Sequence, residues 1–106
     1  MIAILLSMFL LTSSLQIEVD NVSTGTWGNE SWQGLVKVEA YFTNYTGEDI
    51  NYSPKIYYNG NVKQLKTITV PAMETISMEY WIVFGDPGFE KFYQEVKQGR
   101  VDVRVR

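Results

Sequence analysis

Residues 34–44, GLVKVEAYFTN, decide the fold class of this chain. Every second side chain in the stretch is apolar, and together these form one side of the expected strand: Val36, Val38, Ala40 and Phe42. The side chains between them are mostly polar: Lys37, Glu39, Tyr41 and Thr43. Successive side chains of a β-strand point to opposite faces, so this period of two predicts a strand with one buried face.

The same period recurs along the rest of the chain. Residues 75–84, TISMEYWIVF, predict a second strand whose inward side chains are Ile76, Met78, Tyr80, Ile82 and Phe84. The C-terminus repeats the pattern, with Val101, Val103 and Val105 expected to face inward. Residues 16–22, QIEVDNV, are a weaker candidate for a first strand, and residues 23–34 are the one long stretch expected to be irregular.

A hairpin is expected between the two strongest strands. Residues 55–58 lead into Asn59-Gly60, and residues 61–70 return before Pro71 interrupts the chain. Asn-Gly supplies the two positive φ angles that a type I′ turn requires, which makes this a strong local signal.

One segment near the C-terminus has the spacing of a helix. Asp86 is a candidate N-cap, Pro87 suits the first helical position, and Gly99 suits the position just past the end. Apolar side chains recur between them at helical spacing: Phe89, Phe92, Tyr93 and Val96. The pattern predicts an amphipathic helix that packs its aromatic stripe against the core.

These elements predict an all-β fold, an immunoglobulin-like antiparallel β-sandwich with one short C-terminal amphipathic helix before the last strand. The chain has 106 residues, which is room for one domain. Because it contains no cysteine, packing and not disulfides must hold the sandwich together.

The first residues differ in character from the rest. Residues 1–17, MIAILLSMFLLTSSLQI, carry no charged side chain. The apolar run from residue 1 to residue 11 would span about 16 Å as a helix, roughly half a bilayer, which is the length of a signal-peptide core. We expect residues 1–15 to be a signal peptide or membrane anchor and 16–106 the sandwich domain. The alternative is an apolar strand or helix of the core.

Four N-x-S/T motifs also favour export. They begin at Asn21, Asn29, Asn44 and Asn51, and each is a candidate N-glycosylation site. Turns are rich in Asn, Ser and Thr for conformational reasons, so the alternative is that these motifs mark turns.

The chain lacks the residue types that most catalytic mechanisms require. The chain has no histidine and no cysteine, the usual general base, nucleophile and metal ligands. It has no glycine-rich phosphate loop, and its adjacent acids Glu48-Asp49 lie in a polar turn. We expect no enzyme activity, no metal site and no cofactor.

The charge pattern excludes a nucleic-acid partner. The net charge is −3, and Arg100, Arg104 and Arg106 alternate with other residues as on the solvated face of a strand. We expect contact with a membrane only through the N-terminal segment.

A recognition site is expected around two tryptophans. Trp27 and Trp32 fall in the stretch expected to be irregular, beside Asn, Ser and Gln, and Tyr45 adds a further aromatic side chain. Indoles stack on sugars and anchor protein interfaces, so these residues are candidates for binding a glycan or a surface protein. The alternative is that the indoles cover an edge of the sandwich.

The stretch from Val36 to Val105 resembles the water-stress and hypersensitive-response (WHy) domain of group 2 late-embryogenesis-abundant proteins. The matching pieces are VKVEAYFTN, KIYYNGNVKQL, ITVPAMETISMEYWIVF and, after the helix and its glycine, VDVRV. The family has an Asn-Pro turn where this chain has Asn44-Tyr45-Thr46-Gly47, and that variant is equally similar to the cell-adhesion-related CARDB modules. Both resemblances imply an immunoglobulin-like sandwich without catalytic activity, and neither implies particular site residues.

The expected function is therefore that of a non-catalytic module, secreted or anchored at the outer face of the cell membrane. It would be accessory or stress-associated, or a structural component of the surface. The alternative is a module that recognises a glycan or a protein through Trp27 and Trp32.

Overall fold

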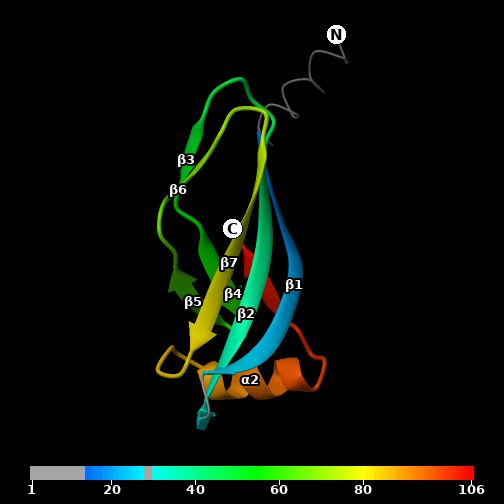
Figure 1. The fold of residues 1–106 in the computed structure, drawn as a ribbon, viewed down its shortest axis with the longest axis vertical. Coiled ribbons are helices and arrows are strands. Elements are labelled where there is room, and N and C mark those ends of the chain that lie inside the picture. Colours follow the sequence, from blue (N-terminus) through cyan, green and yellow to red (C-terminus); the bar gives the residue numbers. More distant parts are fainter. Residues whose placement is uncertain (1–13, 28–29) are drawn as a thin grey trace.

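The computed structural model describes residues 14–27 and 30–106, with side chains described for residues 14–25 and 34–106. The strands in chain order are β1 (Leu15–Trp27), β2 (Glu30–Asn44), β3 (Ile50–Tyr52), β4 (Lys55–Tyr58), β5 (Asn61–Gln64), β6 (Ile68–Val70), β7 (Thr75–Val83) and β8 (Val103–Val105). Helix α2 (Phe89–Lys97) lies between β7 and β8 (Figure 1). Within the described residues, the chain is the antiparallel all-β fold with one short helix before the last strand that the sequence predicts.

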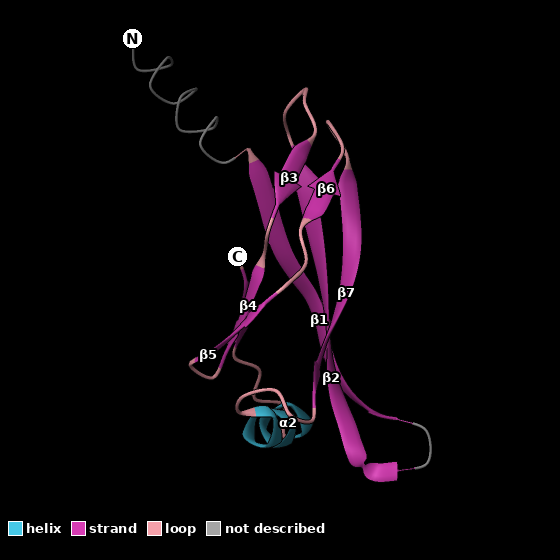
Figure 2. Cartoon of the chain, turned by 90° about the vertical axis from the view of Figure 1, so that its left-hand side faces the viewer, coloured by secondary structure: helices cyan, strands magenta, loops and turns pink. Residues whose placement is uncertain are grey.

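The strands form two layers. One layer is a three-stranded sheet in the order β1-β2-β7, which runs the length of the molecule (Figure 2). The other layer is made of a two-stranded sheet, β3-β6, and a three-stranded sheet, β5-β4-β8. Helix α2 lies across one end of the sandwich (Figure 2).

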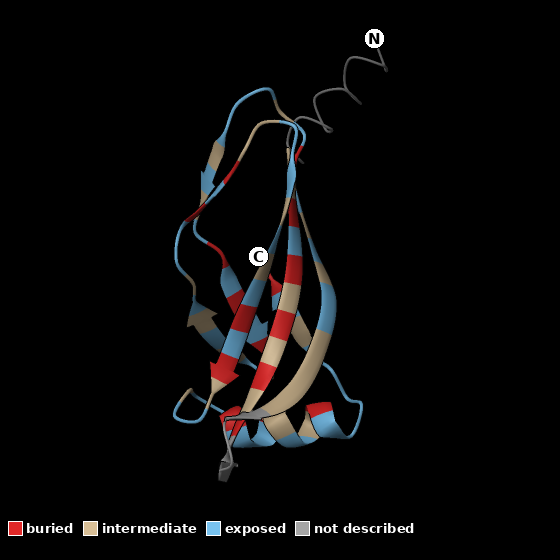
Figure 3. Cartoon of the chain, in the orientation of Figure 1, coloured by how far each residue is buried: buried red, intermediate tan, exposed pale blue. Residues whose placement is uncertain are grey.

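The central strand β2 carries the period-two stretch. It pairs with β7 without interruption from Leu35 opposite Val83 to Thr43 opposite Thr75. Its four alternate apolar side chains are almost inaccessible to solvent: Val36, Val38, Ala40 and Phe42. Figure 3 shows this alternation as buried and less buried bands along the strand. The buried face is thus the one that the sequence predicts.

The first strand is longer than its sequence pattern indicates. β1 extends to Trp27, so the prediction of an irregular stretch over residues 23–34 is wrong. The residues concerned pair with β2, from Ser23 opposite Lys37 onward. They lack strict alternation, but threonine favours the extended backbone and the backbone pairing with β2 continues through them. A register shift interrupts the pairing between Val19 and Asn21, leaving Asp20 as the bulged residue.

The predicted hairpin is present but its return arm is divided. Asn59 and Gly60 have φ angles of 48° and 79°, as a type I′ turn requires, and they join β4 to β5. β5 ends at Gln64, and β6 pairs with β3 instead of β4. The single return strand over residues 61–70 is therefore wrong, because the second half of the arm crosses to another sheet.

The helix begins later than predicted. Its N-cap is Gly88, with φ 67°, and Asp86 is not the cap. The Asp86 carboxylate instead accepts hydrogen bonds from the Val83 N–H and the Lys63 ammonium, both at 2.8 Å. The C-terminal prediction is confirmed, since Gly99 has φ 80° and closes the helix with the paired hydrogen bonds of a Schellman motif.

The core lies between the layers and under the helix. Phe89, Phe92 and Val96 of α2 are buried, and the Phe92 ring lies 4.9 Å from that of Tyr58 on β4. Two expected core residues are outside it: Phe84, which follows the end of β7, and Val101, which precedes β8, are 57% and 48% exposed. The strand period predicts both as inward only when it is extended past the true end of the strand.

Candidate functional site

The two tryptophans of the predicted site lie at the tip of the β1–β2 hairpin. Trp27 is the last residue of β1 and pairs with Glu30, and Trp32 lies in β2. They therefore occupy strands and not a loop, although they are close to the turn; their side chains are outside the described residues. Figure 2 shows this hairpin reaching past helix α2 at one end of the molecule.

Tyr45 lies at the opposite end of the same hairpin. Its backbone N–H donates to the Ser14 carbonyl at 2.9 Å, and its hydroxyl donates to Gln16 at 3.0 Å. β1 has 13 residues, so about 40 Å of strand separates this end from Trp27. Tyr45 thus cannot belong to one site with the tryptophans, although its exposed ring leaves it available at its own end.

The candidate glycosylation residues have different surroundings. Asn21 is exposed on β1, and Asn51 is exposed on β3, where its side-chain oxygen accepts from the Thr69 hydroxyl at 2.7 Å. Asn29 lies outside the described residues. Asn44, however, is fully buried.

Asn44 uses every hydrogen-bonding position of its side chain. Its Nδ2 donates to the carbonyls of Glu48 at 2.7 Å and Val70 at 3.0 Å. Its Oδ1 accepts from the backbone N–H of Thr46 at 2.8 Å and from the Thr46 hydroxyl at 2.7 Å. A glycan on Nδ2 would displace these bonds and has no space in the core, so the folded domain excludes glycosylation at Asn44. The Asn-Tyr-Thr motif instead forms an Asx-turn that ties the end of β2 to β6.

Hydrogen bonds tie the turn that carries the two adjacent acids to the rest of the chain. Glu48 and Asp49 are exposed, the Glu48 carbonyl accepts from Asn44, and an Asp49 carboxylate oxygen accepts from the Ala72 N–H at 3.0 Å. Among the residues that the structure describes, no three acidic side chains gather where they could hold a cation.

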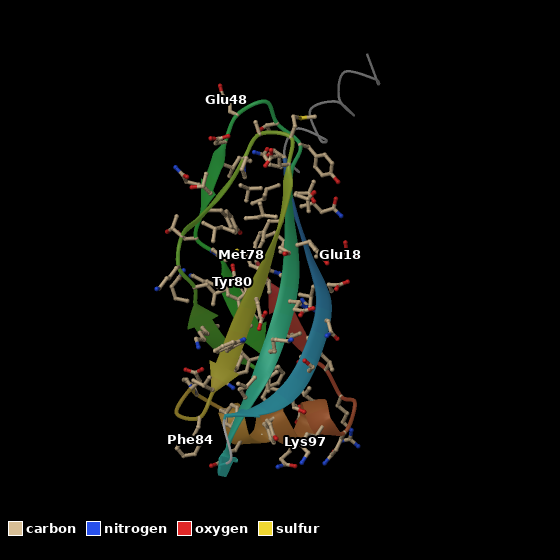
Figure 4. The ribbon with its side chains drawn as sticks, in the orientation of Figure 1. Glu18, Glu48, Met78, Tyr80, Phe84 and Lys97 are labelled. Atoms are coloured by element: carbon tan, nitrogen blue, oxygen red, sulfur yellow. The ribbon has the colours of Figure 1, made fainter. Side chains whose placement is uncertain are left out.

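The side of the sandwich along β7 has a groove that the sequence did not predict. It encloses about 510 Å³ between β7 and the segment joining β5 to β6. Its apolar lining includes Leu65, Ile68, Met78 and Tyr80, with Lys66 among the polar residues at its margin. Met78 and Tyr80 come from the inner face of β7 (Figure 4). The alternation of β7 indicated these side chains as core but could not show that the core is open beside them.

Two buried tyrosines, Tyr80 and Tyr58, have raised pKa values. The Tyr80 hydroxyl has no hydrogen-bond partner among the described residues, and its burial raises the pKa above the ordinary value of 10.0. Tyr58 donates to the Pro87 carbonyl at 2.7 Å; burial, together with the nearby charge of Asp86, raises its pKa also. Both phenols stay protonated at neutral pH and act as packing groups and not as bases.

No protein-family model, curated protein or solved structure matches this chain. In the described part of the chain, no helix is both long and apolar enough to cross a membrane.

Proposed function

We propose that the chain is a non-catalytic β-sandwich module that is secreted or tethered at the outer face of the cell membrane. Residues 1–15 would direct its export or anchor it, and the sandwich would act through its surface as an accessory, stress-associated or structural component. The absence of histidine and cysteine from the sequence supports a non-catalytic role.

The proposal is supported by the positions of the N-terminal segment and the hairpin tip, which lie at opposite ends of the molecule. The uncharged N-terminal segment joins the sandwich at the end where Leu15 pairs with Asn44. The hairpin tip with Trp27 lies about 40 Å away along β1. A chain attached or exported through its N-terminus would thus present the far end of the hairpin away from the attachment.

Two contacts at the start of β1 favour a leader that ends before residue 15. Leu15 belongs to β1 and packs against the core, and the Ser14 carbonyl accepts from Tyr45. We therefore expect a leader, if it is removed, to end at residue 13 or 14, slightly before the boundary of residue 15 expected from the sequence. A cut inside β1 would remove pairs from the edge of the sheet.

The test is the intact mass of the protein recovered separately from the membrane and medium fractions of its native cells. A mass that begins at Ser14 or Leu15 in the medium, or a full-length mass in the membrane fraction, is expected. A full-length mass in the soluble interior of the cell would refute the proposal. A strain without the protein should also lose tolerance to drying, salt or heat if the stress-associated role is correct.

A second candidate function is recognition of a surface glycan or protein by the hairpin tip. It is favoured by the position of Trp27 and Trp32 at the end of a ribbon that extends beyond the two-layer core (Figure 2). Trp27→Ala and Trp32→Ala should abolish binding to an array of cell-surface polysaccharides and secreted proteins, with little change in Tm. Tyr45→Ala, an exposed aromatic at the other end, is the control. A large drop in Tm for the tryptophan variants would instead place the indoles in the packing.

A further inference from the structure

The outer edge of β7 has backbone groups that no strand covers. The sheet order places β7 at an edge, with β2 on its other side. The Asn44 N–H donates to the Glu74 carbonyl, so even-numbered residues of β7 exchange hydrogen bonds with β2. The N–H and C=O groups of the odd-numbered residues Thr75, Ser77 and Glu79 therefore point outward.

One end of this edge is already occupied. The Lys63 ammonium donates to the Trp81 carbonyl at 2.8 Å, and Asp86 bonds both the N–H and the carbonyl of Val83. Within the described residues, no group of the chain bonds the outward backbone of Ser77 or Glu79. The open segment of the edge is thus Thr75–Glu79.

The two edges of the long sheet are protected unequally. β1 has a bulge at Asp20 and a second acid, Glu18, both of which discourage pairing with another strand. β7 is regular over its full pairing with β2 and carries a single charge, Glu79. Natural proteins blunt exposed edges with bulges, charges and prolines, so an unprotected edge is a surface that pairs.

We propose that the open edge of β7 pairs with β7 of a second copy of this chain. The two strands run antiparallel about a twofold axis at Ser77, so that Ser77 lies opposite Ser77 of the second copy and Thr75 lies opposite its Glu79. Each of the three outward residues then exchanges two backbone hydrogen bonds with its opposite, which makes about six in all.

The sequence of β7 selects this register among its neighbours. Centring the axis on Glu79 would place two carboxylates directly opposite each other, which is destabilising. Centring it on Met78 would require the backbone of Trp81, whose carbonyl Lys63 already occupies. The register centred on Ser77 uses only the open residues and sets no like charges in opposition.

The groove beside β7 fits the same partner. In this register Ile76 of the second copy lies opposite Met78, on the inner face of the extended sheet. The groove of about 510 Å³ opens at this point and is lined by Leu65, Ile68 and Tyr80. The apolar side chains of the added strand would therefore enter an apolar space. A second copy supplies both the free backbone and the side chains that the groove accepts, and the inference stands independently of export.

The test is sedimentation equilibrium of the full chain, from low micromolar to near-millimolar concentration. The wild-type mass should rise from that of a monomer to that of a dimer. Ser77→Lys and Ser77→Glu should each remain monomeric, because like charges would lie directly opposite each other. An equimolar mixture of the two variants should recover the dimer, since a lysine then faces a glutamate.

Asn21→Lys is the matched control, because it adds the same charge at an exposed position on the other edge of the sheet and should not change the association. All samples contain residues 1–13, so association through that segment would be common to every variant. Ser77→Pro removes an outward N–H that β2 does not use; it should also give a monomer with a nearly unchanged far-UV spectrum. A wild-type chain that stays monomeric throughout, or a dimer that survives both charge variants, would overturn the proposal. Failure of the mixture to associate would overturn the register.

Discussion

Replacing Asn44 by aspartate changes one atom at the most constrained side chain of the fold. Asn44→Asp keeps the size and shape of the side chain but puts an oxygen where Nδ2 now donates. That oxygen would face the carbonyls of Glu48 and Val70, at 2.7 and 3.0 Å in the present geometry. Two hydrogen bonds would become two repulsive contacts in a fully buried site.

The magnitude follows from the groups left without partners. A buried carbonyl that loses its donor costs about 1–3 kcal/mol, and the Val70 carbonyl would bear this cost. The Glu48 carbonyl is only partly buried and keeps the Thr46 hydroxyl as a donor at 2.9 Å, so its loss adds less. Domains of this size have a free energy of unfolding of about 5–15 kcal/mol, and small ones lie toward the lower end. Asn44→Asp should therefore remove a large part of the stability, and Asn44→Ala, which loses the same donors without adding a charge, should cost somewhat less.

The pH dependence separates the two variants. Burial against two carbonyls disfavours the charged form, so the pKa of the introduced carboxyl in the folded state lies above its ordinary value near 4. The folded state then holds a proton that the unfolded state loses. The deficit of Asn44→Asp is therefore smallest below pH about 4, and it grows as the pH rises through the raised pKa. The deficit of Asn44→Ala should not depend on pH.

The assay is urea unfolding followed by tryptophan fluorescence, repeated across the acidic range. Asn51→Asp is the matched control, because Asn51 is exposed and its side-chain oxygen is an acceptor already, so little change is expected. If Asn44→Asp costs no more than Asn51→Asp, Asn44 is not buried as described and its glycosylation becomes feasible again.

Three further predictions concern packing and acidity. Gly34→Ala should lower stability by about 1–3 kcal/mol in thermal unfolding, because its Cβ would lie 2.7 Å from the Tyr93 ring. A Gly34→Ala variant as stable as the wild type would show that α2 packs elsewhere. Tyr80→Phe should leave the Tm unchanged or slightly raised, since its buried hydroxyl has no partner in the described chain; a clear loss would reveal a partner. The raised pKa values of Tyr58 and Tyr80 keep protons on the folded state, so the stability that they contribute is complete below pH about 10 and is lost as the pH rises through them. Replacing both with phenylalanine should flatten the loss of unfolding free energy in alkaline titrations, and an unchanged slope would contradict the assignment.

The sequence predicted those parts of the fold that depend on local geometry. The burial of Val36 and Phe42 followed from strand period alone, and the turn at Asn59-Gly60 followed from the positive φ angles that it requires. Gly99 ended the helix for the same reason. In each case the physical requirement is met within a few neighbouring residues.

The errors arose where a distant segment competes for a local group. Asp86 has the side chain of an N-cap, but Lys63 and the Val83 N–H engage its carboxylate, and the N-cap lies two residues later at Gly88. Asn44 has the motif of a glycosylation site, but the Val70 carbonyl, 26 residues away, fixes it in the core. Residue type cannot distinguish these outcomes, because the deciding partner is set by the tertiary fold.

The edge position of β7 also could not be predicted from the sequence. Apolar and polar side chains alternate in β2 and β7 alike, and only the sheet order makes β2 central and β7 an edge strand. That edge also bears on the proposed export of the protein. Thr75 pairs with Thr43, beside the end where the chain enters β1, so an antiparallel copy centred on Ser77 extends past that end. A membrane close to residue 14 would occupy the same space. We therefore expect the dimer only for chains released from the membrane. Cross-linking of Ser77→Cys variants should succeed in medium and fail in membrane fractions, and efficient cross-linking of anchored chains would refute either the register or the short anchor.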